Sequence, residues 1–157
     1  MNKAVRFRAA VQVNDFLPLS RRDPTAFEGA AMAFRRALEQ AGVSLADMDF
    51  AEVHDCFTIA ELLVVEAMGL APQGQGARPI LDGVTQIGGK LPINVSGGLK
   101  AKGHPIGATG VSMHAIAAMQ LTGTAGAMQL PKADRGLVFN MGGAAVANYV
   151  SVLEPLR

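Results

Sequence analysis

A histidine and the only cysteine of the chain lie two positions apart in the segment His54-Asp55-Cys56-Phe57. The apolar pattern predicts a strand ending in this segment and a helix starting after it, and ligands of open α/β sheets collect at such strand ends. Because side chains alternate along a strand, we expect His54 and Cys56 to share one face and Asp55 to take the other. A thiol beside an imidazole and near a helix N-terminus could act as a nucleophile or as an acid/base. The alternative is a buried structural cysteine beside a hydrogen-bonded histidine.

A second histidine lies in the glycine-rich stretch 94–110, which runs from Asn94 through Gly103, His104 and Pro105 to Gly110. Glycines let the backbone approach a substrate closely, and Pro105 stiffens the turn that presents His104. The stretch matches neither the Walker phosphate loop nor the G-x-G-x-x-G pattern. A flexible glycine loop is the alternative, but packing alone does not explain a histidine held in such a stretch.

The third candidate segment, residues 139–145, separates the last two predicted strands and contains Asn140, Gly142 and Gly143. As pure structure it is a glycine hairpin turn. As function, its backbone N–H groups could point at a developing oxyanion.

Hydrophobic periodicity predicts the elements that position these segments. Strand-like alternation predicts a first strand with an apolar face formed by Val5, Phe7, Ala9, Val11 and Val13. Asp23 and Pro24 are the predicted N-cap and first residue of an amphipathic helix that Gly42 ends. Further strands are predicted over 49–56, 91–94, 137–140 and 145–153, and helices over 58–69, from a Thr58–Glu61 capping box, and over 111–121. Residues 72–90 form a predicted surface loop. The alternation of strands and helices predicts an α/β fold with a mixed five-stranded sheet and helices on both faces, in a single domain over residues 1–157.

Composition excludes several function classes. Half of the residues are hydrophobic, which suffices for a core, and the net charge of +1 is spread evenly, which argues against a nucleic-acid partner. One cysteine cannot form an internal disulfide and, with three histidines, makes a poor metal site, so no metal is predicted. No signal peptide and no apolar run of roughly 18 residues is found, so no membrane span and a cytoplasmic location are predicted.

The helix predicted over residues 111–121 has almost no polar side. Such a helix is buried all round, and a domain of this size rarely buries one completely. We therefore expect a partner layer to cover it, and we expect the isolated chain to expose an apolar face or to self-associate as an oligomer.

Four motifs together resemble the C-terminal half of thiolases, most closely the sterol-carrier-protein-type (lipid-transfer) branch. They are H-D-C-F at 54–57, N-V-S-G-G at 94–98, G-H-P-I-G-A-T-G at 103–110 and N-M-G-G at 140–143, and the similarity extends from about Val5 to Leu153. The resemblance implies two similar α/β halves stacked in five layers, with helix 111–121 buried between the sheets. It also implies acyl transfer between a cysteine and coenzyme A. Coenzyme A is then a substrate, no cofactor is tightly bound, and the nucleophilic cysteine belongs to an N-terminal thiolase half that is missing here.

The resemblance also implies roles for individual residues. His104 would activate the nucleophilic thiol and bind the acyl carbonyl, and His54 would help to organise the same oxyanion hole. Cys56 would act as acid/base, because Asn140 stands where classical thiolases carry their second cysteine. Three further positions, Asn94, Gly142 and Gly143, would bind the substrate or its oxyanion. Asp55, Gly103 and Pro105 are the supporting motif residues.

Two alternatives to a thiolase half-site remain. Relatives in sterol side-chain breakdown act as aldol lyases on β-hydroxyacyl-CoA together with a small OB-fold protein, and these need no nucleophilic cysteine. A non-catalytic half that binds acyl-CoA or lipid is the third possibility, supported by Asn140 and by the missing nucleophile.

Overall fold

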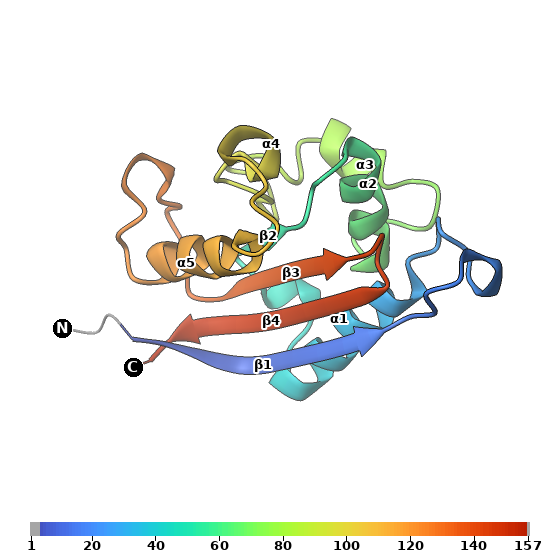
Figure 1. Ribbon diagram of the computed structural model, residues 1–157. Helices are drawn as coiled ribbons and strands as arrows, with labels where there is room; N and C mark the ends of the chain where they lie inside the picture. The colour runs from blue at the N-terminus through green and yellow to red at the C-terminus, as the bar shows by residue number, and fades with distance from the viewer. Residues whose placement is uncertain (1–3, 157) are drawn as a thin grey trace.

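The computed structural model describes residues 4–156, which form one mixed sheet with helices on both faces (Figure 1). The main elements are β1 (Val5–Asn14), α1 (Glu28–Ala41), β2 (Phe50–Val53), α2 (Thr58–Ala67), α3 (Ala77–Leu81), α4 (Gly98–Lys102), α5 (Thr109–Leu121), β3 (Gly136–Gly142) and β4 (Ala147–Pro155). The strand order is β1-β4-β3-β2, in which β2 and β3 are parallel and the other pairs antiparallel. No helix within residues 4–156 is long and apolar enough to cross a membrane.

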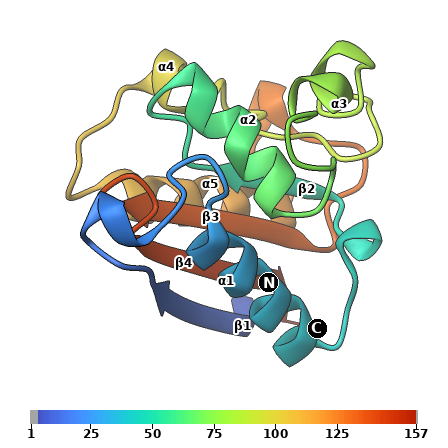
Figure 2. The ribbon, with the colours of Figure 1, turned by 90° about the vertical axis from the view of Figure 1, so that its right-hand side faces the viewer.

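Alternation along the strands divides the core into two layers. Leu137, Phe139 and Met141 of β3 pack in the cluster that includes α1 and α2, whereas Val138 packs in the cluster that includes α5. Helices α1 and α5 accordingly lie on opposite faces of the sheet (Figures 1 and 2). The predicted α/β architecture with helices on both faces is therefore confirmed.

The predicted sheet of five strands is wrong by one strand. Within the described residues, segment 91–94 joins the sheet only through an isolated parallel bridge between Ala51 and Ile93. Ala51 donates its N–H to the carbonyl of Pro92, and Asn94 donates to the carbonyl of Ala51. Asn94 then adopts a left-handed φ of 53°, which turns the chain away before a ladder can form.

The predicted apolar face of β1 is also only partly correct. The pairing with β4 shifts between Phe7 and Ala9, so Arg8 is an extra residue in the strand. Such a bulge reverses the faces on its two sides. Ala9 and Val13 pack toward α1, whereas Phe7 is 57 % exposed and contacts the ring of His114 on α5.

Both predicted N-terminal caps, at Asp23 and at Thr58, differ from the structure. Asp23 does not cap α1: its carboxylate accepts hydrogen bonds from the backbone N–H and hydroxyl of Thr25, so Asp23 and Pro24 form a turn. The helix begins at Glu28, after Phe27 in a left-handed conformation. Helix α2 begins at Thr58 as predicted, but Phe57 occupies the N-cap position and makes no side-chain capping bond. Asp and Thr side chains can bond to several nearby backbone groups, and sequence spacing does not show which of these bonds forms.

Helix α5 is not buried all round within this chain. Met113 and Ala117 are completely buried against the sheet, while Val111 is 71 % exposed and Met119 37 % exposed. The open stripe contains the apolar side chains of Val111 and Met119, and the partner layer over it stays a prediction.

Candidate active site

A pocket of about 370 Å³ opens where the parallel strands β2 and β3 end. Its lining residues are His54, Cys56, Phe57, His104, Ile106, Asn140, Met141, Gly142, Gly143 and Ala144. All three segments singled out from the sequence therefore contribute to one cavity, as expected for the carboxyl edge of parallel strands.

Two imidazoles meet edge to face in this pocket. The ring centroids of His54 and His104 lie 4.9 Å apart with an interplanar angle of 88°. His54 follows β2 and stays in line with it because its backbone N–H donates to the carbonyl of Phe139, at 3.0 Å. His54 is only 5 % exposed, whereas His104 is exposed on its loop. The pair of rings therefore consists of a buried imidazole, His54, and an accessible one, His104.

The partners of His104 define its basic nitrogen. Its Nδ1 lies 2.7 Å from the hydroxyl oxygen of Thr109, and that hydroxyl donates to the carbonyl of Pro105 at 3.1 Å. The Thr109 oxygen must therefore accept from Nδ1–H, which leaves the lone pair of the neutral ring on Nε2. His104 is thus arranged to act as a base through Nε2. Gly103, with a φ of 86°, and Pro105 flank it in the loop and do not line the pocket.

His54 is held by Asn140 of β3. Its Nδ1 lies 2.7 Å from the side-chain oxygen of Asn140. Burial lowers the pKa of His54, and the hydrogen bond that its Nδ1–H donates to the Asn140 oxygen only partly opposes this shift. His54 is therefore neutral at pH 7.

The thiol of Cys56 lines the same pocket and is half-buried. Burial raises the pKa of this thiol, while the backbone N–H of Phe57 acts in the opposite direction. The protonated thiol therefore dominates at pH 7, which suits proton transfer better than a standing thiolate nucleophile.

We expect Cys56 to react slowly with iodoacetamide at pH 7 and progressively faster above pH 9, because the thiolate is the reactive form. The rate is measured by mass spectrometry as a function of pH, and Cys56→Ser provides the unlabelled control. The profile should be the same in His104→Ala, because burial is the main cause of the raised pKa. A rate that is already maximal at pH 7 would contradict this assignment.

The turn after β3 forms one wall of the pocket. Gly143 has a φ of 62°, and Ala144 and Ala145 follow with φ values of 52° and 64°. Arg22 donates from Nη1 to the carbonyl of Ala144 at 2.9 Å and so holds this turn from a distant loop. Sequence reasoning did not identify Arg22, because its spacing from the turn carries no signal.

Asn94 and Asp55 lie outside the lining of the pocket. The side-chain oxygen of Asn94 accepts from the backbone N–H of Val53 at 2.8 Å, and the carboxylate of Asp55 accepts from that of Leu99 at 2.8 Å. A Cβ at Gly98 would collide with the Asp55 carboxylate. Both side chains therefore secure the backbone around the pocket, and Asp55 takes a different direction from His54 and Cys56.

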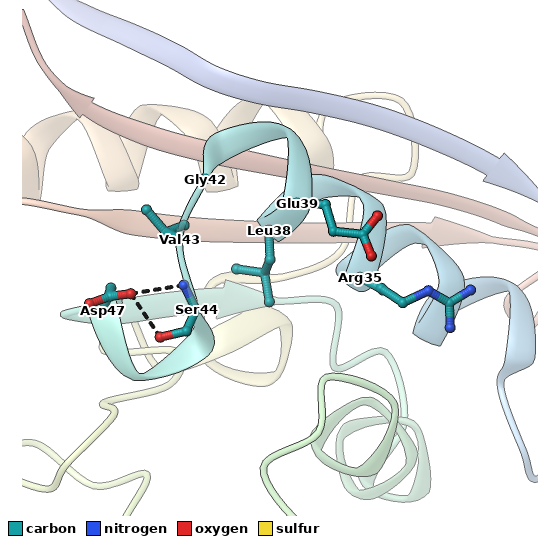
Figure 3. A pocket seen from close by; sticks show the side chains of 7 residues that line it. All are labelled: Arg35, Leu38, Glu39, Gly42, Val43, Ser44 and Asp47. Atoms are coloured by element: carbon teal, nitrogen blue, oxygen red, sulfur yellow. Dashed lines mark hydrogen bonds between the residues drawn. The ribbon is translucent and has the colours of Figure 1, made fainter.

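A second hollow, at the C-terminal end of α1, offers no comparable chemistry. It is lined by Arg35, Leu38, Glu39, Gly42, Val43, Ser44 and Asp47 (Figure 3). The carboxylate of Asp47 is already engaged by the N–H and hydroxyl of Ser44, at 2.8 and 2.7 Å. Within residues 4–156, no group of three or more His, Cys, Asp or Glu is placed to hold a metal ion.

Comparisons with known proteins agree with this arrangement. The profile of the family described as "Thiolase C-terminal domain-like" matches residues 11–155. Acetyl-CoA acetyltransferase of Methanothermobacter thermautotrophicus is 43 % identical over 140 residues, which cover 88 % of this chain and 37 % of that protein. Sterol carrier protein 2 of Homo sapiens is 43 % identical over 151 residues, covering 92 % of this chain and 27 % of that protein. The chain thus spans little more than a third of such relatives, or less.

A solved structure shares the fold. The "Ltp2-ChsH2(DUF35) aldolase" superposes with a TM-score of 0.83 at 24 % sequence identity, covering 96 % of this chain and 39 % of that one. At this identity the likeness concerns the fold alone.

Proposed function

The chain belongs to the thiolase C-terminal domain-like family, and from this premise we propose that it supplies one half of the active site of a lipid-transfer-type thiolase acting on acyl-CoA. The observation that carries the proposal is the convergence of His54, Cys56 and His104 on one pocket, with the imidazoles 4.9 Å apart. The other half of the site, with the nucleophilic cysteine, comes from an N-terminal thiolase half. Coenzyme A is a substrate, and no tightly bound cofactor is needed.

In the first step, Nε2 of His104 accepts the proton of the nucleophilic thiol, and the thiolate attacks the keto carbon of a 3-ketoacyl-CoA. The bond between C2 and C3 breaks, and its electron pair remains on C2 as the enolate of acetyl-CoA. The protonated thiol of Cys56 delivers a proton to C2. The N–H groups of Gly142 and of the protonated His104 are the donors that we assign to the developing oxyanions, and such donors contribute roughly 3–4 kcal/mol each.

In the second step, an incoming CoA thiol gives its proton to the Cys56 thiolate and attacks the acyl-enzyme carbonyl. The nucleophilic cysteine leaves as a thiolate and recovers its proton from His104. Every group is thereby restored. The raised pKa of Cys56 supports this role, because a thiol that stays protonated at rest can donate to the enolate and accept in the next step.

An aldol lyase acting on β-hydroxyacyl-CoA with a small OB-fold partner is the second candidate. The same pocket favours it, because a base at His104 and a proton donor at Cys56 suffice to cleave a β-hydroxy thioester without a nucleophilic cysteine. The partner layer over α5 would then differ in composition, but the exposed stripe around Val111 and Met119 would still be covered. Oligomerisation of the assembled enzyme is part of either proposal.

The decisive experiment combines the chain with its candidate N-terminal half and measures cleavage of acetoacetyl-CoA. We expect cleavage that requires free CoA and is lost in Cys56→Ala. Release of an aldehyde or ketone from a β-hydroxyacyl-CoA without any need for CoA would instead establish the aldol lyase. Binding of acyl-CoA without turnover in any mixture would show a non-catalytic half.

A further inference from the structure

A partly buried ion pair outside the lining of the pocket joins β2 to the end of α4. Nζ of Lys102 is 3.2 Å from Oε2 of Glu52, whose side chain is completely buried, while that of Lys102 is 21 % exposed. The hydroxyl of Ser96 donates to the same carboxylate oxygen at 2.8 Å and accepts from Nζ of Lys102 at 3.0 Å. The three side chains form a closed network in which both charges are paired.

The network is in register with the pair of histidines. Phe50 packs in the α5 cluster while Ala51 and Val53 pack in the α1 cluster, so Glu52 projects to the α5 side of β2. His54 continues that face, since its ring bonds to Asn140, which alternates with Phe139 of the α1 cluster. Glu52 of β2 therefore lies two positions before His54, which follows the strand, and Lys102 at the end of α4 lies two positions before His104.

We propose that the Glu52–Lys102 ion pair is a positioning device that fixes His104 opposite His54. The ion pair joins Glu52 to Lys102, and two positions further along each segment the imidazoles of His54 and His104 are in contact. The inference deepens the proposed function, on which its catalytic consequence rests. Neither Glu52 nor Lys102 lines the pocket, so neither is placed to touch the substrate.

The loop that carries His104 needs such an anchor. It leaves α4 through Gly103, with a φ of 86°, and His104 through Ala108 are exposed. The carboxylate of Asp55 holds the start of α4 by accepting from the backbone N–H of Leu99. The end of α4 is held by the bond from Lys102 to Glu52. Losing one partner of a buried pair leaves an uncompensated charge, so we expect removal of Lys102 to disturb the backbone next to it.

The test uses the three histidines as probes. In the chain labelled at histidine, proton NMR should show a contact between the rings of His54 and His104, and a second contact between His114 and Phe7, whose ring centroids lie 5.6 Å apart. In Lys102→Met we expect the first contact to be lost and the second to remain. Lys100→Met is the matched control: this lysine contacts the backbone carbonyl of Asp55, and its loss should leave both contacts in place.

Activity is measured separately, in the assembly with the N-terminal half. A displacement of the catalytic base by about 1 Å lowers kcat about 10²-fold, so Lys102→Met should show this loss with little change in KM, and Lys102→Arg should recover part of it. Should Lys102→Met disturb both ring contacts, the double variant Glu52→Gln/Lys102→Met, which leaves no unpaired charge, replaces it.

The outcomes separate the two proposals. Persistence of the His54–His104 contact in folded Lys102→Met, or in the double variant, would overturn the positioning role. Loss of that contact with unchanged kcat would support the positioning role and would instead contradict the catalytic role of His104.

Discussion

Replacing His104 with alanine is expected to lower kcat for CoA-dependent acyl cleavage about 10²–10⁴-fold, the usual contribution of a general base. His104 presents a basic Nε2 because Thr109 takes its Nδ1–H, and its ring lines the pocket beside Cys56. The measurement is steady-state cleavage of acetoacetyl-CoA by the chain assembled with its N-terminal half. Since His104 is exposed, the variant should keep the circular dichroism spectrum of the parent chain.

His114 provides the matched control for this variant. It is a histidine of α5 that bonds to the carbonyl of Gly110 and to the hydroxyl of Ser151 and does not line the pocket. His114→Ala should therefore change kcat far less than His104→Ala. Equal activity of both variants and the parent chain would remove His104 from the mechanism.

Phe139→Ala is expected to reduce the free energy of unfolding by about 3–5 kcal/mol, the range found when a buried phenylalanine is truncated. Phe139 lies in the middle of β3, is completely buried, and packs its ring 4.8 Å from that of Phe34 of α1. The vacated volume is bounded by the sheet and α1, so the surroundings can collapse only partly. Urea unfolding followed by circular dichroism gives the difference directly.

Phe7→Ala is the control for the size of the side chain. Phe7 also lies in a strand, but it is 57 % exposed, so its loss should cost less than about 1 kcal/mol. If both variants lost the same stability, the assignment of Phe139 to the core that supports the pocket would be wrong. The result also bears on the site, because Asn140 and the partner carbonyl of His54 belong to the same stretch of β3.

Local patterns in the sequence predicted the main elements of the fold and the three segments that meet in the pocket. Residue types and glycine content marked the segments of His54, Cys56 and His104 as separate candidates, and the resemblance to thiolases predicted that these side chains share one site. The roles assigned to them stay predictions until activity is measured. The structure adds their geometry, since the 4.9 Å separation of the imidazoles follows from no sequence spacing.

The features that sequence reasoning missed depend on partners distant in the chain. The side chain of Asn94 accepts from the backbone N–H of Val53, and its left-handed backbone turns the chain away from β2 after the bridge at Ile93. A fifth strand was therefore expected where a turn occurs. Lys102 was given no role from the sequence, but it pairs with Glu52, which is 50 positions earlier in the chain. Long-range pairing of this kind has no period and leaves no local signature.

The extra residue in β1 has a consequence for how chains of this kind can differ in length. Phe7 and Ala9 are aligned with Leu153 and Val152, which are neighbours in β4, so removing Arg8 would restore an unbroken ladder without reversing either side chain. The deletion would remove the hydrogen bond from Arg8 to the carbonyl of Ala41 and its ion pair with Glu154, but the hydrophobic layers would stay intact. Position 8 is therefore the point in this strand where a one-residue gap in an alignment is compatible with an unchanged core.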